Sequence, residues 1–485
     1  MLATTVFANL ILGAALFALP RRLEHWARWI ALAPATASLV ISVLAMVLYD
    51  RDRGGFQFEE RLPWLDSLGI SWHTGVDGIS APMLLLTGIV MFTSVLISWN
   101  LENRPREFFA LLLMLVSGVY GVFVSLDLFF LFFFYEVAVL PMYLLIAVWG
   151  STRREYAAMK LVMYLLAGSI LVWIGLLVVY VAAGATSFDL LDLQAAGFDT
   201  NLARVVFPLL YVGFGVLAGM WPFHTWSPDG HVAAPTAVSM LHAGVLMKLG
   251  AYGIIRVALT ILPEGARDWL WLLIVLGTVN VIYGAFSAMA QRDLKFVIGY
   301  SSVSHMGYVL MGIGTLTAAG LNGAVFQMFS HGIMTALFFA MVGVVYDRAH
   351  TREIGEFSGL ARRMPKWAIL FLVAGLASLG LPGLSGFAAE VLVFVGTFQS
   401  YPVLGVLAVV GVAITAVYIL RLAAAVFFGP LSDKWRGIAD ASRLEVFAGG
   451  ILAVTLLVFG LFPFLLYDYI GGAVAPLIGR VVAAL

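Results

Sequence analysis

Six ionisable side chains lie deep inside apolar runs of this sequence, where little water is available to solvate a charge. They are Glu136, His242, Lys248, His305, His331 and Glu390. An unpaired charge at the centre of a membrane costs at least about 2.5 to 3.5 kcal/mol, so six such groups indicate a function rather than chance. Carboxylates, amines and imidazoles can all bind and release a proton, and histidine does so near neutral pH. The residue types therefore predict a proton path at membrane depth.

Each group also has a structural interpretation. Glu136 could be a protonated acid that bonds to a neighbouring helix, the histidines could join helices by hydrogen bonds, and Glu390 could reach outward to the membrane surface. The number of such groups favours function for Glu136, Lys248 and Glu390, whereas His305 and His331 leave the two interpretations equally open. Ser301 and Gln327, four residues before these histidines, share their helix faces and could bond a ring or hold a water molecule.

His242 lies six residues before Lys248, which is about 240° around a regular helix. The two side chains should therefore face different neighbours. A further histidine, His224, stands at the end of an interrupted apolar run and joins the candidate set.

The composition describes a polytopic membrane protein. Of 485 residues, 62% are hydrophobic and 11% are charged, whereas soluble domains carry about 25% charged residues. The absence of cysteine excludes Cys-ligated iron–sulfur clusters and thiolate chemistry in this chain. Scattered histidines lack metal-ligand spacing, and we expect no cofactor. A net charge of zero without basic clusters argues against a nucleic-acid partner, and lipids are the expected surroundings.

Fourteen apolar segments are long enough to cross a membrane. The predicted spans are 2–20, 28–49, 76–99, 108–125, 128–149, 158–183, 205–226, 233–256, 268–290, 294–314, 318–346, 367–398, 403–428 and 444–467. The N-terminal run lacks the basic start and cleavage site of a signal peptide, and we interpret it as the first span. The expected fold is all-α, a single transmembrane domain over residues 1–485.

The distribution of basic residues predicts the orientation of these spans. Of the 27 Lys and Arg residues, 18 fall in loops after odd-numbered spans or at the span ends beside those loops, and 7 lie in or beside the remaining loops and termini, while Lys248 and Arg421 lie well inside spans. Because Lys and Arg concentrate in cytoplasmic loops, we expect both termini on the non-cytoplasmic side.

Two spans contain residues that interrupt helices. The seventh holds Gly219 and Pro222, and the twelfth holds a Gly-Leu-Pro-Gly sequence from Gly380 to Gly383. Such breaks expose backbone groups that must face protein or water, and they can mark ion paths. The breaks lie five spans apart and start from opposite sides, which predicts two inverted five-helix repeats, residues 108–256 and 268–428.

Five segments resemble the antiporter-like subunits of respiratory complex I, and most closely the subunit M branch. They are "FFFYEVAVLPMYLLIAVWG", "WPFHTWSPDGHVAAPTAVSMLHAGVLMKLGAYG", "DLKFVIGYSSVSHMGYVLMGI", "QMFSHGIMTALFF" and "GLPGLSGFAAEVLVFVGTF". The resemblance implies fourteen helices, a bacterial inner-membrane location, and proton translocation driven by quinone reduction in other membrane subunits of the complex. It also implies that this chain carries no redox chemistry.

By this resemblance, five residues carry the central proton axis: Glu136, Lys248, His305, His331 and Glu390. One position departs from the family pattern, because Leu217 stands where a lysine usually pairs with the glutamate of the fifth span. His242 is a second departure, since the subunit M branch usually has an apolar residue there. His242 or His224 could replace the missing lysine as the partner of Glu136, or Glu136 could be protonated and its half-channel inert.

Two other functions remain open at this stage. The chain could be an ion-translocating subunit of a multisubunit cation/proton antiporter or of a membrane-bound hydrogenase. It could also be a structural scaffold whose buried polar groups only hold helices together.

Overall fold

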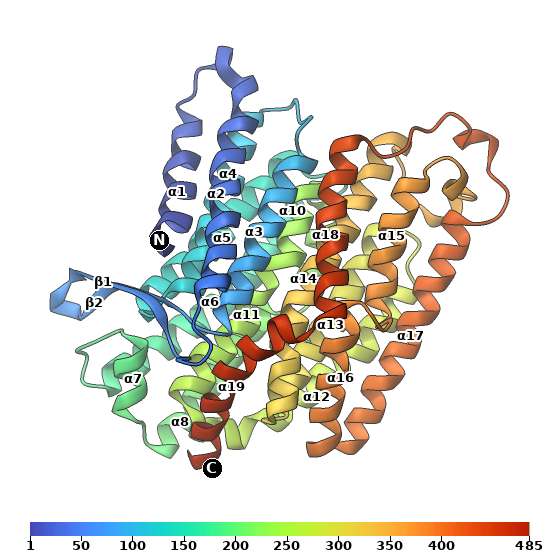
Figure 1. The fold of residues 1–485 in the computed structure, drawn as a ribbon. Coiled ribbons are helices and arrows are strands. Elements are labelled where there is room, and N and C mark those ends of the chain that lie inside the picture. Colours follow the sequence, from blue (N-terminus) through green and yellow to red (C-terminus); the bar gives the residue numbers. More distant parts are fainter. Residues whose placement is uncertain (485) are drawn as a thin grey trace.

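The computed structural model describes residues 1–484 and shows a bundle of helices with one small hairpin (Figure 1). The helices are α1 (Leu2–Phe17), α2 (Ala27–Leu48), α3 (Ser80–Ile97), α4 (Pro105–Val124), α5 (Leu128–Trp149), α6 (Arg154–Ala182), α7 (Leu190–Ala196), α8 (Thr200–Leu217), α9 (Trp226–Ala233), α10 (Thr236–Leu241), α11 (Met247–Gly253), α12 (Pro263–Met289), α13 (Leu294–Gly314), α14 (Ala318–Ala349), α15 (Pro365–Ser378), α16 (Ser385–Ser400), α17 (Pro402–Phe427), α18 (Arg443–Leu461) and α19 (Phe464–Ala484). The hairpin pairs β1 (Gln57–Leu65) with β2 (Ile70–Val76).

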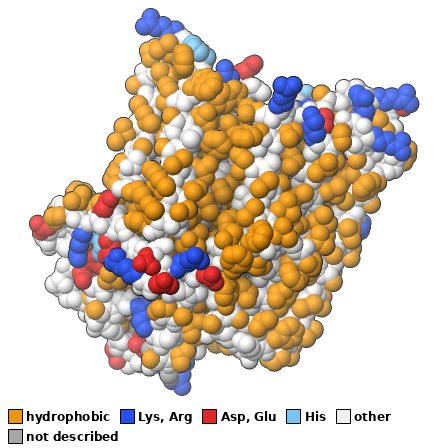
Figure 2. Space-filling view, in the orientation of Figure 1, with side chains coloured by type: hydrophobic (Ala, Val, Ile, Leu, Met, Phe, Trp, Pro, Cys, Tyr) orange, Lys and Arg blue, Asp and Glu red, His pale blue; other side chains and the backbone are white. Residues whose placement is uncertain are grey.

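The helical architecture follows from the apolar sequence, because a segment in hydrocarbon must satisfy its backbone hydrogen bonds internally. Thirteen helices within residues 1–484 are long and apolar enough to span a membrane. This set includes α19 and leaves out the shorter α1 and the two halves of the broken twelfth span. Figure 2 shows a broad hydrophobic surface between two ends where the charged side chains gather.

We name these two ends by what they carry. The hairpin end holds β1, β2, α7 and the start of α5, and the arginine-rich end holds the loops 150–153, 290–293 and 350–363. Successive spans alternate between the ends, as the prediction of antiparallel spans requires.

All fourteen predicted spans correspond to helices or broken helices, and two of them, α5 and α13, match the prediction to the residue at both ends. Three elements were missing from the prediction: the hairpin, α7 and α19. The last predicted span, 444–467, is wrong at its end, because α18 stops at Leu461 and a new helix starts at Phe464. The hydroxyl of Tyr469 on α19 donates to the Met46 carbonyl at 2.8 Å, so the start of α19 packs against the C-terminal end of α2.

Both predicted breaks are present. The seventh span consists of α8 and α9 and so continues to Ala233, beyond its predicted end at 226, and the twelfth span divides into α15 and α16. At the first break, the buried Asn280 of α12 accepts from the Trp221 N–H at 2.6 Å and donates to the Gly219 carbonyl at 2.8 Å. A side-chain amide thus satisfies backbone groups that the interrupted helix leaves unpaired.

Two aspartates hold the β1–β2 hairpin against the end of the helix bundle. The backbone N–H of Ser71 on β2 donates to Asp127 at 2.9 Å, and the His73 ring lies 2.5 Å from the carboxylate of Asp189. Burial lowers the pKa of His73, but the hydrogen bond and charge of Asp189 outweigh burial and raise that pKa above its ordinary value. Burial likewise raises the pKa of Asp189, and the bond and charge of His73 outweigh it and lower that pKa. We call the His73–Asp189 pair the hairpin clamp.

Candidate functional site

Lys248 is fully buried within the bundle. The eighth span that carries it is irregular: a π-helical turn over His242–Leu246 precedes α11, and a second over Ile254–Leu259 follows it. Such π-turns often occur at functional sites. The lysine ammonium donates back to the carbonyl of Ala243, within the first of these turns, and its Nζ lies 2.9 Å from Nδ1 of His331.

Two histidines continue from this lysine into the second half of the chain. The rings of His331 on α14 and His305 on α13 are stacked, with centroids 5.5 Å apart. Nδ1 of His305 lies 3.4 Å from Oε1 of Glu390 on α16, and Nε2 lies 3.0 Å from the hydroxyl of Ser378. Four of the predicted site residues therefore form one contiguous chain, from Lys248 through both histidines to Glu390.

The second break positions the far end of this chain. Ser378 is the last residue of α15, and Glu390 lies in the second turn of α16, so the interruption brings both side chains to His305. Gly380 has φ +70°, and a Cβ there would lie 2.6 Å from Oε2 of Glu390. Glycine is required here for both the backbone conformation and the close approach of the carboxylate.

The neighbours predicted for the histidine rings are partly different in the structure. Gln327, expected beside His331, reaches His305 instead, with its amide nitrogen 3.2 Å from Nδ1. Ser301 accepts a hydrogen bond from the Tyr418 hydroxyl at 2.7 Å. Helix spacing placed these side chains on the correct faces, but the packing of α13 against α14 and α17 decided their partners.

Glu136 stands apart from the contiguous chain. It lies eight residues into α5 from the hairpin end, is partly buried, and its Oε1 has no hydrogen-bond partner within residues 1–484. Ser169 on α6 is the polar side chain that interacts with its carboxyl group. Leu217, at the end of α8, is fully buried and brings no charge to this region.

Neither candidate replacement partner pairs with Glu136 among the described residues. His242 stacks on Trp226 and contacts His231, with ring centroids 5.1 and 4.0 Å apart. His224 packs edge-on against Tyr283 of α12 at 5.0 Å, and both of its ring nitrogens lack a partner within residues 1–484. The expectation that His242 and Lys248 face different neighbours is confirmed, since Lys248 contacts His331.

Sequence reasoning missed two buried groups near this site. His231 on α9 is fully buried, and Lys295 in the first turn of α13 is nearly so and donates to the Ala234 carbonyl at 2.7 Å. A signal was available in the segment "SPDGHVAAP", where a histidine lies nine residues after Pro222 of the first break. Its flanking glycine and prolines made it look like a loop residue.

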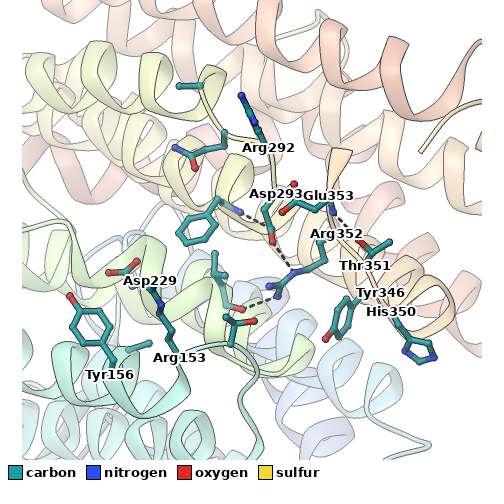
Figure 3. A pocket seen from close by; sticks show the side chains of 16 residues that line it. Arg153, Tyr156, Asp229, Arg292, Asp293, Tyr346, His350, Thr351, Arg352 and Glu353 are labelled. Carbon is teal, nitrogen blue, oxygen red and sulfur yellow. Dashed lines mark hydrogen bonds and ion pairs between the residues drawn. The ribbon is translucent and has the colours of Figure 1, made fainter. Parts of the chain in front are cut away.

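A cavity of about 1110 Å³ opens near these groups at the arginine-rich end (Figure 3). Its lining includes Asp229 and Val232 of α9 together with Arg153, Asp293 and Arg352. The Arg352 guanidinium donates to Asp293 at 3.1 Å and to the Val232 carbonyl at 3.1 Å. Polar walls and this volume are sufficient for water to reach α9.

The sequence matches a family described as "NADH:quinone oxidoreductase/Mrp antiporter, TM" over residues 125–415. It is 40% identical over 466 residues to NADH-quinone oxidoreductase subunit M of Rhodobacter capsulatus, covering 93% of this chain and 90% of that protein. It is 41% identical over 475 residues to an NAD(P)H-quinone oxidoreductase chain 4 of Thermosynechococcus vestitus, covering 95% and 88%. The fold is similar to a chain of respiratory complex I from Thermus thermophilus, with TM-score 0.91, 29% identity, and coverage of 99% and 100%.

Proposed function

Because the chain belongs to the family of NADH:quinone oxidoreductase and Mrp antiporter membrane subunits, we propose that it translocates protons across a bacterial inner membrane. The translocation is coupled to quinone reduction in other subunits of the complex, and this chain contributes no redox chemistry. Its partners are the other membrane subunits, as for the similar chains found within multisubunit complexes.

The observation that carries this proposal is the contiguous chain of proton-binding groups. Each group lies close to the next: Lys248 Nζ is 2.9 Å from the His331 ring, and the His331 and His305 ring centroids are 5.5 Å apart. The His305 ring in turn lies 3.4 Å from the carboxylate of Glu390. All four side chains are buried, so protons on them exchange with their neighbours rather than with bulk water. Groups of this kind at membrane depth are typical of proton relays in pumps and transporters.

The proposal includes the two inverted repeats, residues 108–256 and 268–428. Matching hydrogen bonds at opposite ends support it: Leu128 N–H donates to the Phe188 carbonyl at 2.9 Å, and Leu294 N–H donates to the Arg352 carbonyl at 3.0 Å. In both places the preceding aspartate caps the helix. The first repeat then supplies Lys248, and the second supplies the histidines and Glu390.

We place the arginine-rich end in the cytoplasm and both termini on the other side, from the distribution of basic residues. A reporter fused to the C-terminus should be inactive if it works only in the cytoplasm. Cytoplasmic activity of that reporter would contradict the orientation.

The test of the proton path is Lys248→Met in the assembled complex, in sealed membrane vesicles. Quinone reduction and proton uptake are measured together, and we expect the ratio of protons to electrons to fall while quinone reduction continues. Glu136→Gln should lower that ratio less, because Glu136 has no contact with the chain of four groups. Lys366→Met, at an exposed lysine, is the matched control and should change neither quantity.

Two results would point to other functions. A proton response that requires sodium would favour a cation/proton antiporter subunit, which the family description also names. An unchanged proton-to-electron ratio in Lys248→Met would favour a structural scaffold.

A further inference from the structure

A second cavity, of about 680 Å³, opens at the arginine-rich end beside α17. Its apolar lining comes from α12, α13 and α17 and includes Met289, Val297, Leu422 and Ala425. Three exposed charged side chains also line it: Arg292, Glu353 and Arg421. Two of these, Arg292 and Glu353, lie between this cavity and the cavity near α9, and they line both (Figure 3). The second cavity therefore offers both apolar contact and charge to an occupant.

Arg421 is a cation on a face of α17 that is otherwise apolar and exposed. Three valines share this face, each 43 to 55% exposed: Val406, Val410 and Val417. At about 100° per residue, these positions and Arg421 fall within about 60° around the helix axis. Arg421 lies six residues before Phe427, the last residue of α17, which is about 9 Å along the helix. Because long basic side chains near a helix end extend toward the membrane surface, we expect this guanidinium at the level of the lipid phosphates.

The three charges on the cavity lining are not neutralised within the part of the chain that the structure describes. The side chains of Arg292, Glu353 and Arg421 make no hydrogen bond or ion pair with residues 1–484. Glu356, which also lines the cavity, is by contrast paired with Lys434. Two guanidinium groups and one carboxylate thus remain available. Guanidinium groups bind phosphate through strong, often bidentate hydrogen bonds, and a carboxylate accepts from an ammonium group.

We propose that this cavity binds the headgroup of a membrane phospholipid that carries a phosphate and a primary ammonium, as phosphatidylethanolamine does. Arg292 and Arg421 donate to the phosphate, and Glu353 accepts from the ammonium. The acyl chains lie along the exposed valine face of α17. The site shares no residue with the chain of proton-binding groups, so the inference goes beyond the proposed function and does not depend on it.

The test uses the assembled complex with Ala425→Cys in this chain, freed of lipid in detergent. Ala425 is exposed and lines the cavity, so a water-soluble thiol reagent should label the new cysteine until a headgroup covers it. The chain has no other cysteine, and labelling is measured on this subunit after the complex is separated. We expect phosphatidylethanolamine to protect the cysteine at lower concentration than phosphatidylglycerol or phosphatidylcholine, which lack the primary ammonium. Phosphorylethanolamine, which has the headgroup charges but no acyl chains, should not protect it over the same range.

Variants of the charged residues assign the contacts. Arg421→Gln and Arg292→Gln should each raise the phosphatidylethanolamine concentration for half protection by at least about tenfold, because each removes a hydrogen bond between charged groups. Glu353→Gln should remove the preference for phosphatidylethanolamine over phosphatidylglycerol. The matched control is Arg436→Gln, at an arginine of the same end whose side chain is 74% exposed and pairs with Asp433, and it should leave protection unchanged.

Four outcomes would overturn the inference. Equal protection by the three lipids would remove the assigned headgroup, and protection by phosphorylethanolamine would identify a soluble phosphate ligand instead of a lipid. A cysteine that stays unlabelled in the lipid-free complex would show that a neighbouring subunit covers the cavity. An equal loss of protection in Arg436→Gln would show a general effect of surface charge. Because none of these measurements uses proton uptake, their failure is distinct from a failure of the proposed function.

Discussion

Arg256 anchors the span that carries both His242 and Lys248, and its removal should loosen the hairpin end. The guanidinium donates to the Asp77 carboxylate at 2.6 Å, and each side chain is 7% exposed. Asp77 also accepts from the N–H groups of Ile79 and Ser80 at 3.0 and 2.9 Å, where α3 begins. One ion pair therefore joins the eighth span to the start of α3.

The expected magnitude depends on which partner is removed. Arg256→Gln leaves the Asp77 carboxylate buried without its cation, and breaking a buried pair in this way costs about 3 to 5 kcal/mol. The double variant Asp77→Asn with Arg256→Gln removes both charges and keeps an acceptor for the N–H groups of α3. Because neutral replacements of buried pairs are often close to neutral in stability, the double variant should recover most of the loss.

A single introduced cysteine can measure this opening, since the chain has none of its own. Ala81 is fully buried in the first turn of α3, and Ala81→Cys should react with a thiol reagent only when this region opens. The cost of about 3 to 5 kcal/mol for breaking the pair converts to a rate at about 1.4 kcal/mol for each factor of ten. Arg256→Gln should therefore raise the labelling rate by about two to three and a half powers of ten.

The control is an exposed pair at the same end. Arg51 and Asp468 lie 3.4 Å apart with both side chains 49% exposed, so Arg51→Gln should change labelling by less than about one decade. An increase of less than tenfold in Arg256→Gln would refute the anchoring argument. A double variant that labels as fast as the single one would refute the charge explanation.

Two further predictions concern the hairpin end and the first break. The contribution of His73 to the hairpin clamp should be complete below about pH 6.5 and disappear as pH rises through the raised pKa of His73. The contribution of Asp189 to the hairpin clamp should be present above about pH 3.9 and disappear as pH falls through the lowered pKa of Asp189. Proteolysis of the hairpin should therefore be slowest between these limits. His73→Gln should remove the alkaline increase, and an unchanged profile would contradict the assignment. Separately, Asn280→Leu leaves the Trp221 N–H and the Gly219 carbonyl without a partner. Each unpaired buried group should lower the stability of the fold by about 1 to 3 kcal/mol. We expect proton uptake to be lost at a lower temperature than in the wild type; equal inactivation temperatures would show that another group satisfies the break.

Much of the bundle could be predicted because each span is a local property of the chain. Apolar length fixes where a helix must form in hydrocarbon, and Gly380 and Pro222 mark where it must stop. The starts of α5 and α13 are well defined because an aspartate precedes each helix and caps it. The β1–β2 hairpin and α19 were missed, because their stability comes from packing across the bundle end rather than from span length.

The residues of the site were predicted, but most of their individual contacts were not. The sequence by itself determined which side chains would be buried at membrane depth, since residue identity and position along an apolar helix settle that. Only the tertiary structure decided that Lys248 meets His331, 83 residues away, and that Gln327 serves His305. The tertiary structure also placed His242 against His231 rather than beside Glu136. His242 lies in a π-turn and His231 follows a helix break, so the spacing of a regular helix does not give the directions of their side chains.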